Sequence, residues 1–273
     1  MSKKKVLIVT QEMHPYTELT EIAEIARKLP QYAQDSGLEV RVLMPRFGTI
    51  NERRHRLHEV VRLSGMNIIV DDDDYPLIIK VASLPGARMQ VYFLDNEDFF
   101  KRKAIFEDEK GEVFDDNAER MVFFCKGVLE TVKKFGWPPD IVHCHGWMTS
   151  LIPLYLKTAY KNEPLFRNSK VIYSIYSSSL GHTFSSEFLS KASINNLDEG
   201  HLKPYQTGNK ISLHAGAVAL ADALVKGSES LPASVSQELA QTEKPVLEYQ
   251  EGEEYFNSIL EFYQALLQEE VEG

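Results

Sequence analysis

Cysteine and long apolar runs are both scarce in this 273-residue sequence. Its two cysteines, Cys125 and Cys144, are too few for the disulfide framework of a small secreted domain, and they predict reduced thiols in a cytoplasmic protein. The first apolar run, residues 6–9, is too short for the core of a signal peptide. No stretch approaches the ~20 apolar residues of a transmembrane helix. We therefore expect no membrane partner.

Positive charge is also in deficit, with 30 Lys and Arg against 40 Asp and Glu, a net charge of −10. Proteins that bind nucleic acid or anionic membranes usually carry a basic face, so neither partner is expected. The one basic cluster, residues 53–56 (RRHR), suggests a polyanion site. In so acidic a chain, the solvated face of a helix is the better explanation.

Glycine is missing where a phosphate-binding loop would follow the first predicted strand. Residues 11–20 read QEMHPYTELT, without glycine. A diphosphate needs glycine there because the backbone N–H groups must approach it closely, and Glu18 and Glu21 would repel it. The sequence thus argues against a simple nucleotide-binding Rossmann protein, and no cofactor is expected.

Short apolar runs alternate with helical patterns along the chain. This order predicts one doubly wound α/β domain with a mostly parallel sheet and helices on both faces. Strands are expected at residues 5–10, 39–44, 140–144, 170–175 and 222–226. Helices are expected from 22 to Pro30, and at 117–135, 151–160, 213–220 and 255–267. A hairpin at 77–94 would extend one sheet edge antiparallel.

Several boundaries and loops follow from local residue types. Asp115 or Asp116 is expected to cap the helix at 117–135. Residues 181–208 are polar and predict a long loop with short helical pieces, and the pattern after Gly227 weakens until the last helix. Four adjacent carboxylates at residues 71–74 suggest a divalent-metal site, but mutual repulsion favours a solvated loop.

His143 and His145 lie two residues apart on a predicted strand and therefore point the same way. Both could ligate one zinc ion. No companion His or Cys spacing supplies the further ligands, so no metal is expected. Because they end a buried strand, these histidines are better placed to line the carboxyl edge of the sheet, where α/β proteins bind ligands.

Segments in a fixed order carry a family resemblance. They are residues 29–30 (LP), 37–48 (GLEVRVLMPRFG), 91–96 (VYFLDN), 116–120 (DNAER), 136–147 (GWPPDIVHCHGW) and 221–225 (ADALV). Together they resemble the N-terminal domain of bacterial glycogen synthases and plant starch synthases, glycosyltransferase family 5. The resemblance is collinear from residue 5 to about 230. It implies one Rossmann-like half of a GT-B fold, in a family that transfers glucose from ADP-glucose to an α-1,4-glucan without a metal.

The chain departs from this family where the family does its chemistry. The family's KTGGL loop aligns with residues 18–22 (ELTEI), so Glu18 stands at the lysine position and Thr20 and Glu21 replace the glycines. Gly146 stands at the aspartate of HDW, and Tyr176 at the histidine of TVHNLAYQG. These changes predict a pseudoenzyme with a glucan-binding or regulatory role in glycogen metabolism. The alternative is an active synthase completed by a partner chain that supplies the second domain.

The resemblance also sets expectations for domains and partners. Residues 1–232 would be the synthase-like domain, and residues 233–273 an extension ending in an amphipathic helix. Nothing after Leu231 resembles the family's second domain. A face left uncovered by that domain would favour self-association, capping by the last helix, or a complex with a full-length synthase. α-Glucan or nucleotide sugar would bind weakly.

The candidate ligand site follows from strand ends and family position together. We expect a pocket lined by Met13, His14, His145, Trp147 and Tyr176, with the last four as substrate-binding residues and none as a catalytic residue. Trp147 and Tyr176 suit stacking on sugar rings, although a packing role for Trp147 explains it equally well.

Overall fold

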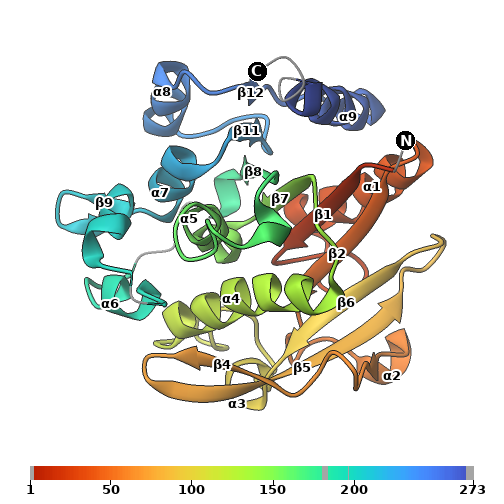
Figure 1. Ribbon diagram of the computed structural model, residues 1–273, viewed down its shortest axis with the longest axis vertical. Coiled ribbons are helices and arrows are strands. Elements are labelled where there is room, and N and C mark those ends of the chain that lie inside the picture. The colour runs from red at the N-terminus through yellow and green to blue at the C-terminus, as the bar shows by residue number, and fades with distance from the viewer. Residues whose placement is uncertain (1–2, 180–183, 196, 269–273) are drawn as a thin grey trace.

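The apolar run at residues 6–9 forms the middle of a strand with neighbours on both sides. The computed structural model describes residues 3–179, 184–195 and 197–268 (Figure 1). β1 (Lys5–Thr10) pairs in parallel with β2 (Glu39–Pro45) and with β7 (Ile141–His145). Its apolar side chains are buried on both faces of the sheet, which explains why the run does not alternate with polar residues.

Ten strands of the described chain form one sheet in the order β12–β11–β8–β7–β1–β2–β6–β5–β3, with β4 paired to β5 beside this row. Neighbours from β12 to β6 are parallel, whereas β5 is antiparallel to β6, β3 and β4. β9 and β10 form a separate antiparallel pair. The remaining strands are β3 (His58–Glu59), β4 (Met66–Val70), β5 (Asp73–Ser83), β6 (Gln90–Asp95), β8 (Lys170–Ile175), β9 (Gln206–Thr207), β10 (Lys210–Ile211), β11 (Ala223–Lys226) and β12 (Val246–Leu247).

Helices cover both faces of this sheet, as its strands predict. α1 and α9 pack together against one face, and α4, α5 and α7 pack against the other (Figure 1). The helices are α1 (Glu21–Asp35), α2 (Glu52–His55), α3 (Glu97–Phe100), α4 (Asn117–Phe135), α5 (Leu151–Lys157), α6 (Phe188–Ala192), α7 (Leu213–Leu220), α8 (Ala233–Gln241) and α9 (Glu253–Gln268). Short 3-10 turns lie at Trp147–Thr149, Pro164–Phe166, Ser177–Ser179 and Glu199–Tyr205. Within the described residues no helix is long and apolar enough to cross a bilayer.

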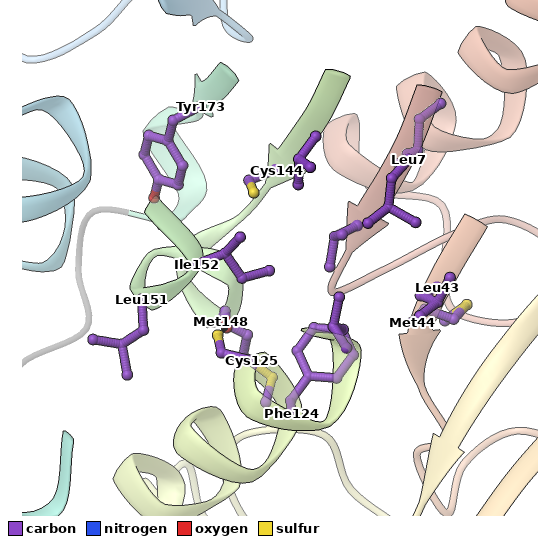
Figure 2. Close-up of a cluster of buried hydrophobic side chains, with 14 of the residues drawn as sticks. Leu7, Leu43, Met44, Phe124, Cys125, Cys144, Met148, Leu151, Ile152 and Tyr173 are labelled. Carbon is purple, nitrogen blue, oxygen red and sulfur yellow. Dashed lines mark hydrogen bonds between the residues drawn. The ribbon is translucent and has the colours of Figure 1, made fainter. Parts of the chain in front are cut away.

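The two cysteines belong to the apolar core between the sheet and α4. Figure 2 shows Cys144 of β7 and Cys125 of α4 among aliphatic and aromatic side chains. Both thiols are free and fully buried, and Cys125 Sγ donates a hydrogen bond to the Met148 carbonyl at 3.0 Å. Burial raises the pKa of both thiols, so they remain protonated and pack as small apolar groups.

The predicted fold class is confirmed, and three of its details need correction. The hairpin extends the sheet as expected, but β6 itself is parallel to β2, and only β5 begins the antiparallel edge. α1 continues through Pro30 to Asp35 because the buried apolar face of the helix outweighs the hydrogen bond that proline cannot donate. α5 ends at Lys157, three residues before the expected end.

Other differences arise where local signals were weak. Asp116 precedes α4 but makes no capping bond, because its carboxylate pairs with Arg102 instead. Residues 71–74 are exposed as expected, although the last two belong to β5. α8 and β12 were not predicted, and β12 extends the main sheet beside β11. A domain boundary at residue 232 stays a prediction.

Candidate functional site

The sheet reverses its strand order between β1 and β7. The chain runs outward through β2 and β6 on one side, and through β8, β11 and β12 on the other. In open α/β sheets this reversal leaves a crevice at the carboxyl ends of the two strands. Here the Gln11 N–H, just after β1, donates to the His145 carbonyl at the end of β7 at 3.2 Å.

The side chain of Gln11 occupies the space beside Gly146. Gln11 is buried, accepts from the Met148 N–H at 3.1 Å and donates to Glu12 Oε1 at 2.9 Å. Gly146 has φ 89° and ψ 163°, a region open almost only to glycine. A Cβ at this position would lie 2.3 Å from Gln11 Oε1. An aspartate therefore does not fit here while Gln11 and this backbone conformation remain.

His143 belongs to the interior of the protein. Its Nδ1 lies 2.6 Å from the Tyr263 hydroxyl of α9, and its Nε2 lies 2.7 Å from Ser174 Oγ of β8. The imidazole of His145 lies beside it, with ring centroids 4.0 Å apart. Burial lowers the pKa of both histidines, and that of His145 to about 3, so both are neutral at pH 7.

Tyr176 closes the crevice above His145. Its hydroxyl lies 2.7 Å from His145 Nδ1, and the whole side chain is buried. Burial raises the pKa of this phenol, which stays neutral. The absence of a side chain at Gly227 makes room for the ring, because a Cβ there would lie 2.4 Å from it. Tyr176 thus fills the crevice end with a packed, uncharged group.

Of the predicted site residues, His145 and Tyr176 are in direct contact, and Met13 and Trp147 belong to the same buried core of the domain. Met13, His145, Trp147 and Tyr176 are each at most 1% exposed, whereas His14 is exposed on the loop after β1. The Trp147 ring lies 4.8 Å from the ring of Phe106, in aromatic packing at the start of a 3-10 turn. Their role in binding a substrate stays a prediction.

Acidic side chains dominate the loop between β1 and α1. Glu12 is buried and accepts hydrogen bonds from Gln11 and from the Thr20 hydroxyl, while Thr20 also caps α1. Glu21 accepts a hydrogen bond from the Ser228 hydroxyl, which joins this loop to the end of β11. Glu18 is exposed. Two of the three carboxylates are therefore held by neutral donors, and the third faces solvent.

An open cavity of about 690 Å³ lies on the other side of this loop, and sequence analysis missed it. Residues 15–18, the segment after β2 with Arg54 and His55, and residues 103–107 line it. The basic cluster at residues 53–56 was the available signal, but sequence spacing did not show that part of it meets the loop after β1. Across the described residues, no group of three or more His, Cys, Asp or Glu is placed to hold a metal ion.

Comparison with known proteins identifies relatives for most of the chain. The family model described as the starch synthase catalytic domain matches residues 5–246. A glycogen synthase of Chlorobium chlorochromatii is 45% identical over 173 residues, which are 63% of this chain and 35% of that protein. A glycogen synthase of Chlorobaculum parvum is 33% identical over 241 residues, 86% of this chain and 48% of that protein.

The fold has a solved counterpart. The catalytic domain of starch synthase IV from Arabidopsis thaliana, bound to ADP and acarbose, aligns over 97% of this chain and 50% of that chain with a TM-score of 0.71 at 20% identity. The chain thus spans between about a third and a half of the relatives that it matches. From the family model and the collinear motifs together, the chain belongs to the starch synthase catalytic domain family.

Proposed function

We propose that this chain is a synthase-like domain that does not itself transfer glucose, and that it acts by binding α-glucan or by regulating a full-length synthase. The observation that carries the proposal is the filled crevice at the carboxyl ends of β1, β7 and β8. Tyr176, held by His145 and packed against Gly227, occupies one end. Gln11, packed against Gly146, occupies the other.

The charge of the same edge supports this proposal. A sugar that leaves a nucleotide diphosphate transfers negative charge to the leaving group, and enzymes stabilise that charge with positioned cations or N–H donors. In the family that the sequence resembles, a lysine occupies the position of Glu18. A carboxylate there repels the diphosphate instead. Backbone amides offer no substitute, because Thr20 and Glu21 stand where paired glycines would expose them.

The positive part of the proposal rests on what the chain retains. Residues 5–246 match the family model, and the packed α/β framework is preserved. A framework that keeps its shape but lacks a donor site is suited to recognise the family's polymer or to contact a synthase chain. A homo-oligomer is a further partner that this proposal allows.

Two assays on the purified chain test the proposal that it does not transfer glucose. One is calorimetry with ADP-glucose, and the other measures incorporation of labelled glucose into glycogen. We expect no binding in the micromolar range and no incorporation. Micromolar binding with turnover, lost in Tyr176→Phe or His145→Gln, would overturn the proposal. Turnover that appears only after a second-domain chain is added, and that needs His145, would support the alternative of a completed synthase.

Titration with maltoheptaose tests the glucan-binding half. We expect NMR chemical-shift changes at His14 and Trp147, and a matched titration with sucrose serves as the control. A parallel assay adds the chain to an active glycogen synthase and measures its rate. The proposal fails in full if maltoheptaose causes no shift and the synthase rate is unchanged.

A further inference from the structure

The 690 Å³ cavity is built from three segments that are distant in sequence. The loop after β1 contributes Tyr16 and Glu18, α2 contributes Arg54 and His55, and the segment after α3 contributes residues 103–107. The filled crevice supplies none of these side chains. The cavity is large enough for one or two sugar rings with a substituent.

Aromatic rings form part of its wall. The buried Tyr16 ring meets the His55 ring edge-on, with centroids 5.0 Å apart. The ring of Phe106 lies against those of Phe47 and Trp147, which fix its position. Burial and the neighbouring Arg54 lower the pKa of His55, so its imidazole is neutral at pH 7. Rigid rings beside a polar neutral group suit the C–H faces and hydroxyls of a sugar.

Charged groups of both signs complete the lining. Lys103 Nζ donates to the Gly48 carbonyl at 2.8 Å, which anchors its charge at the cavity. The Arg54 guanidinium has neither a hydrogen bond nor an ion pair with any residue that the structure describes. Glu18 and Glu107 contribute two carboxylates. A polyanion would be attracted by the two cations and repelled by the two carboxylates, so its net attraction is small. A ligand with one anionic end and one hydroxyl-rich end can bind to both kinds of group.

We propose that this cavity binds a phosphorylated sugar, with the phosphate at Arg54 and Lys103 and the sugar against the rings of Tyr16 and Phe106. The carboxylates of Glu18 and Glu107 accept hydrogen bonds from sugar hydroxyls. This inference goes beyond the proposed function. The two share Glu18, which here meets the sugar end of the ligand and not its phosphate. The phosphate can belong to a free hexose phosphate or to a phosphate ester on a glucan chain.

Calorimetry with glucose 6-phosphate, glucose and inorganic phosphate tests the inference on the full chain. We expect glucose 6-phosphate to bind about tenfold more tightly than glucose or inorganic phosphate alone. Arg54→Gln and Lys103→Gln should each weaken that binding by about tenfold, because each removes a charge-assisted hydrogen bond. Glucose 6-phosphate and a phosphorylated glucan, compared at equal phosphate, distinguish the two sources, and tighter binding of either supports the site.

Matched variants at neighbouring cations provide the control. Arg53 adjoins Arg54 in sequence, and Lys101 lies two residues before Lys103, but neither lines the cavity. Arg53→Gln and Lys101→Gln should change the affinity by less than about twofold, because neither side chain lines the cavity and solvent screens their charges. Equal binding of glucose or of inorganic phosphate, equal losses in the control variants, or no binding of any phosphorylated probe would each overturn the inference.

Discussion

The two ends of the parallel strands differ in how closely their residues match the family's motifs. The ends where the strands begin are called the amino edge here, and the ends where they finish the carboxyl edge. At the amino edge, Asp140 Oδ2 accepts from the Lys5 N–H at 2.8 Å, and Asp222 Oδ2 accepts from the Val171 N–H at 2.8 Å. Both aspartates belong to segments that resemble the family's motifs. At the carboxyl edge, Gly146 and Tyr176 depart from those motifs. The comparison teaches that the retained aspartates hold strands together, whereas the changed residues alter the crevice: Tyr176 fills one end, and Gly146 leaves the space that Gln11 fills.

Arg120 extends the same lesson to a third motif, residues 116–120. Its Nε donates to the Phe99 carbonyl at 2.8 Å and its Nη1 to the Ile105 carbonyl at 2.7 Å. Burial lowers the pKa of Arg120 to about 10, so the side chain remains charged at pH 7. A match to a family motif is therefore explained here by structure, without a catalytic role.

Restoring the family's aspartate at the carboxyl edge should have the largest effect. Gly146→Asp places a side chain at φ 89° and against Gln11. We expect it to lower the free energy of unfolding by about 3 kcal/mol, from backbone strain and overlap together. Urea unfolding measures the loss. Adding Gln11→Ala should recover about 1 kcal/mol, which is the overlap part. A stable Gly146→Asp single variant would contradict the filled crevice.

The second largest effect on stability is expected from protonation of His145 at low pH. The pKa of His145 is about 3 in the folded protein and about 6.5 in the unfolded chain, so below pH 6.5 only the unfolded state takes up the proton. Its contribution to stability is complete above pH 6.5 and is lost as the pH falls towards 3. We expect about 2 kcal/mol less at pH 5 than at pH 7 from this residue. In His145→Gln the pH dependence of urea unfolding should be shallower, and an unchanged slope would contradict the prediction.

Removing a carboxylate at the amino edge should lower the free energy of unfolding by a smaller amount. Asp140→Ala and Asp222→Ala each leave a strand N–H without its acceptor. We expect each to lower the free energy of unfolding by about 1.5 kcal/mol. The exposed Asp35→Ala, at the end of α1, is the control and should show no loss. If Asp140→Ala behaves like the control, the aspartate does not hold the strand.

The smallest effect is expected from the ion pair beside this bond. Lys4 Nζ lies 2.8 Å from Asp140 Oδ1, and the Lys4 side chain is half exposed. Lys4→Ala should lower the free energy of unfolding by at most about 0.5 kcal/mol, because solvent and salt screen exposed pairs. Thermal melts at low and high salt check this value. A loss as large as that of Asp140→Ala would show that the ion pair, and not the hydrogen bond to the Lys5 N–H, accounts for the contribution of Asp140 to stability.

The fold followed from the sequence because the strong signals are local. The apolar run at residues 6–9 and the short apolar pair at 141–142 predicted buried parallel strands, and the pattern at 77–94 predicted a hairpin. Prediction failed where the local sequence signal was weak and residues distant in sequence determine the structure. β12 has two residues and exists because β11 offers it an open edge. Asp116 does not cap α4 because Arg102 competes for its carboxylate.

The candidate site was decided by tertiary structure. The sequence alone determined which residue types stand at the strand ends, including Glu18, Gly146 and Tyr176. It did not determine that Gln11 fills the space at Gly146, or that Gly227 makes room for the Tyr176 ring. Nor did it place Arg54 in one cavity with the loop after β1. Residue type and strand period are properties of neighbours in sequence, whereas the space left between side chains depends on strands that meet only after the sheet has formed.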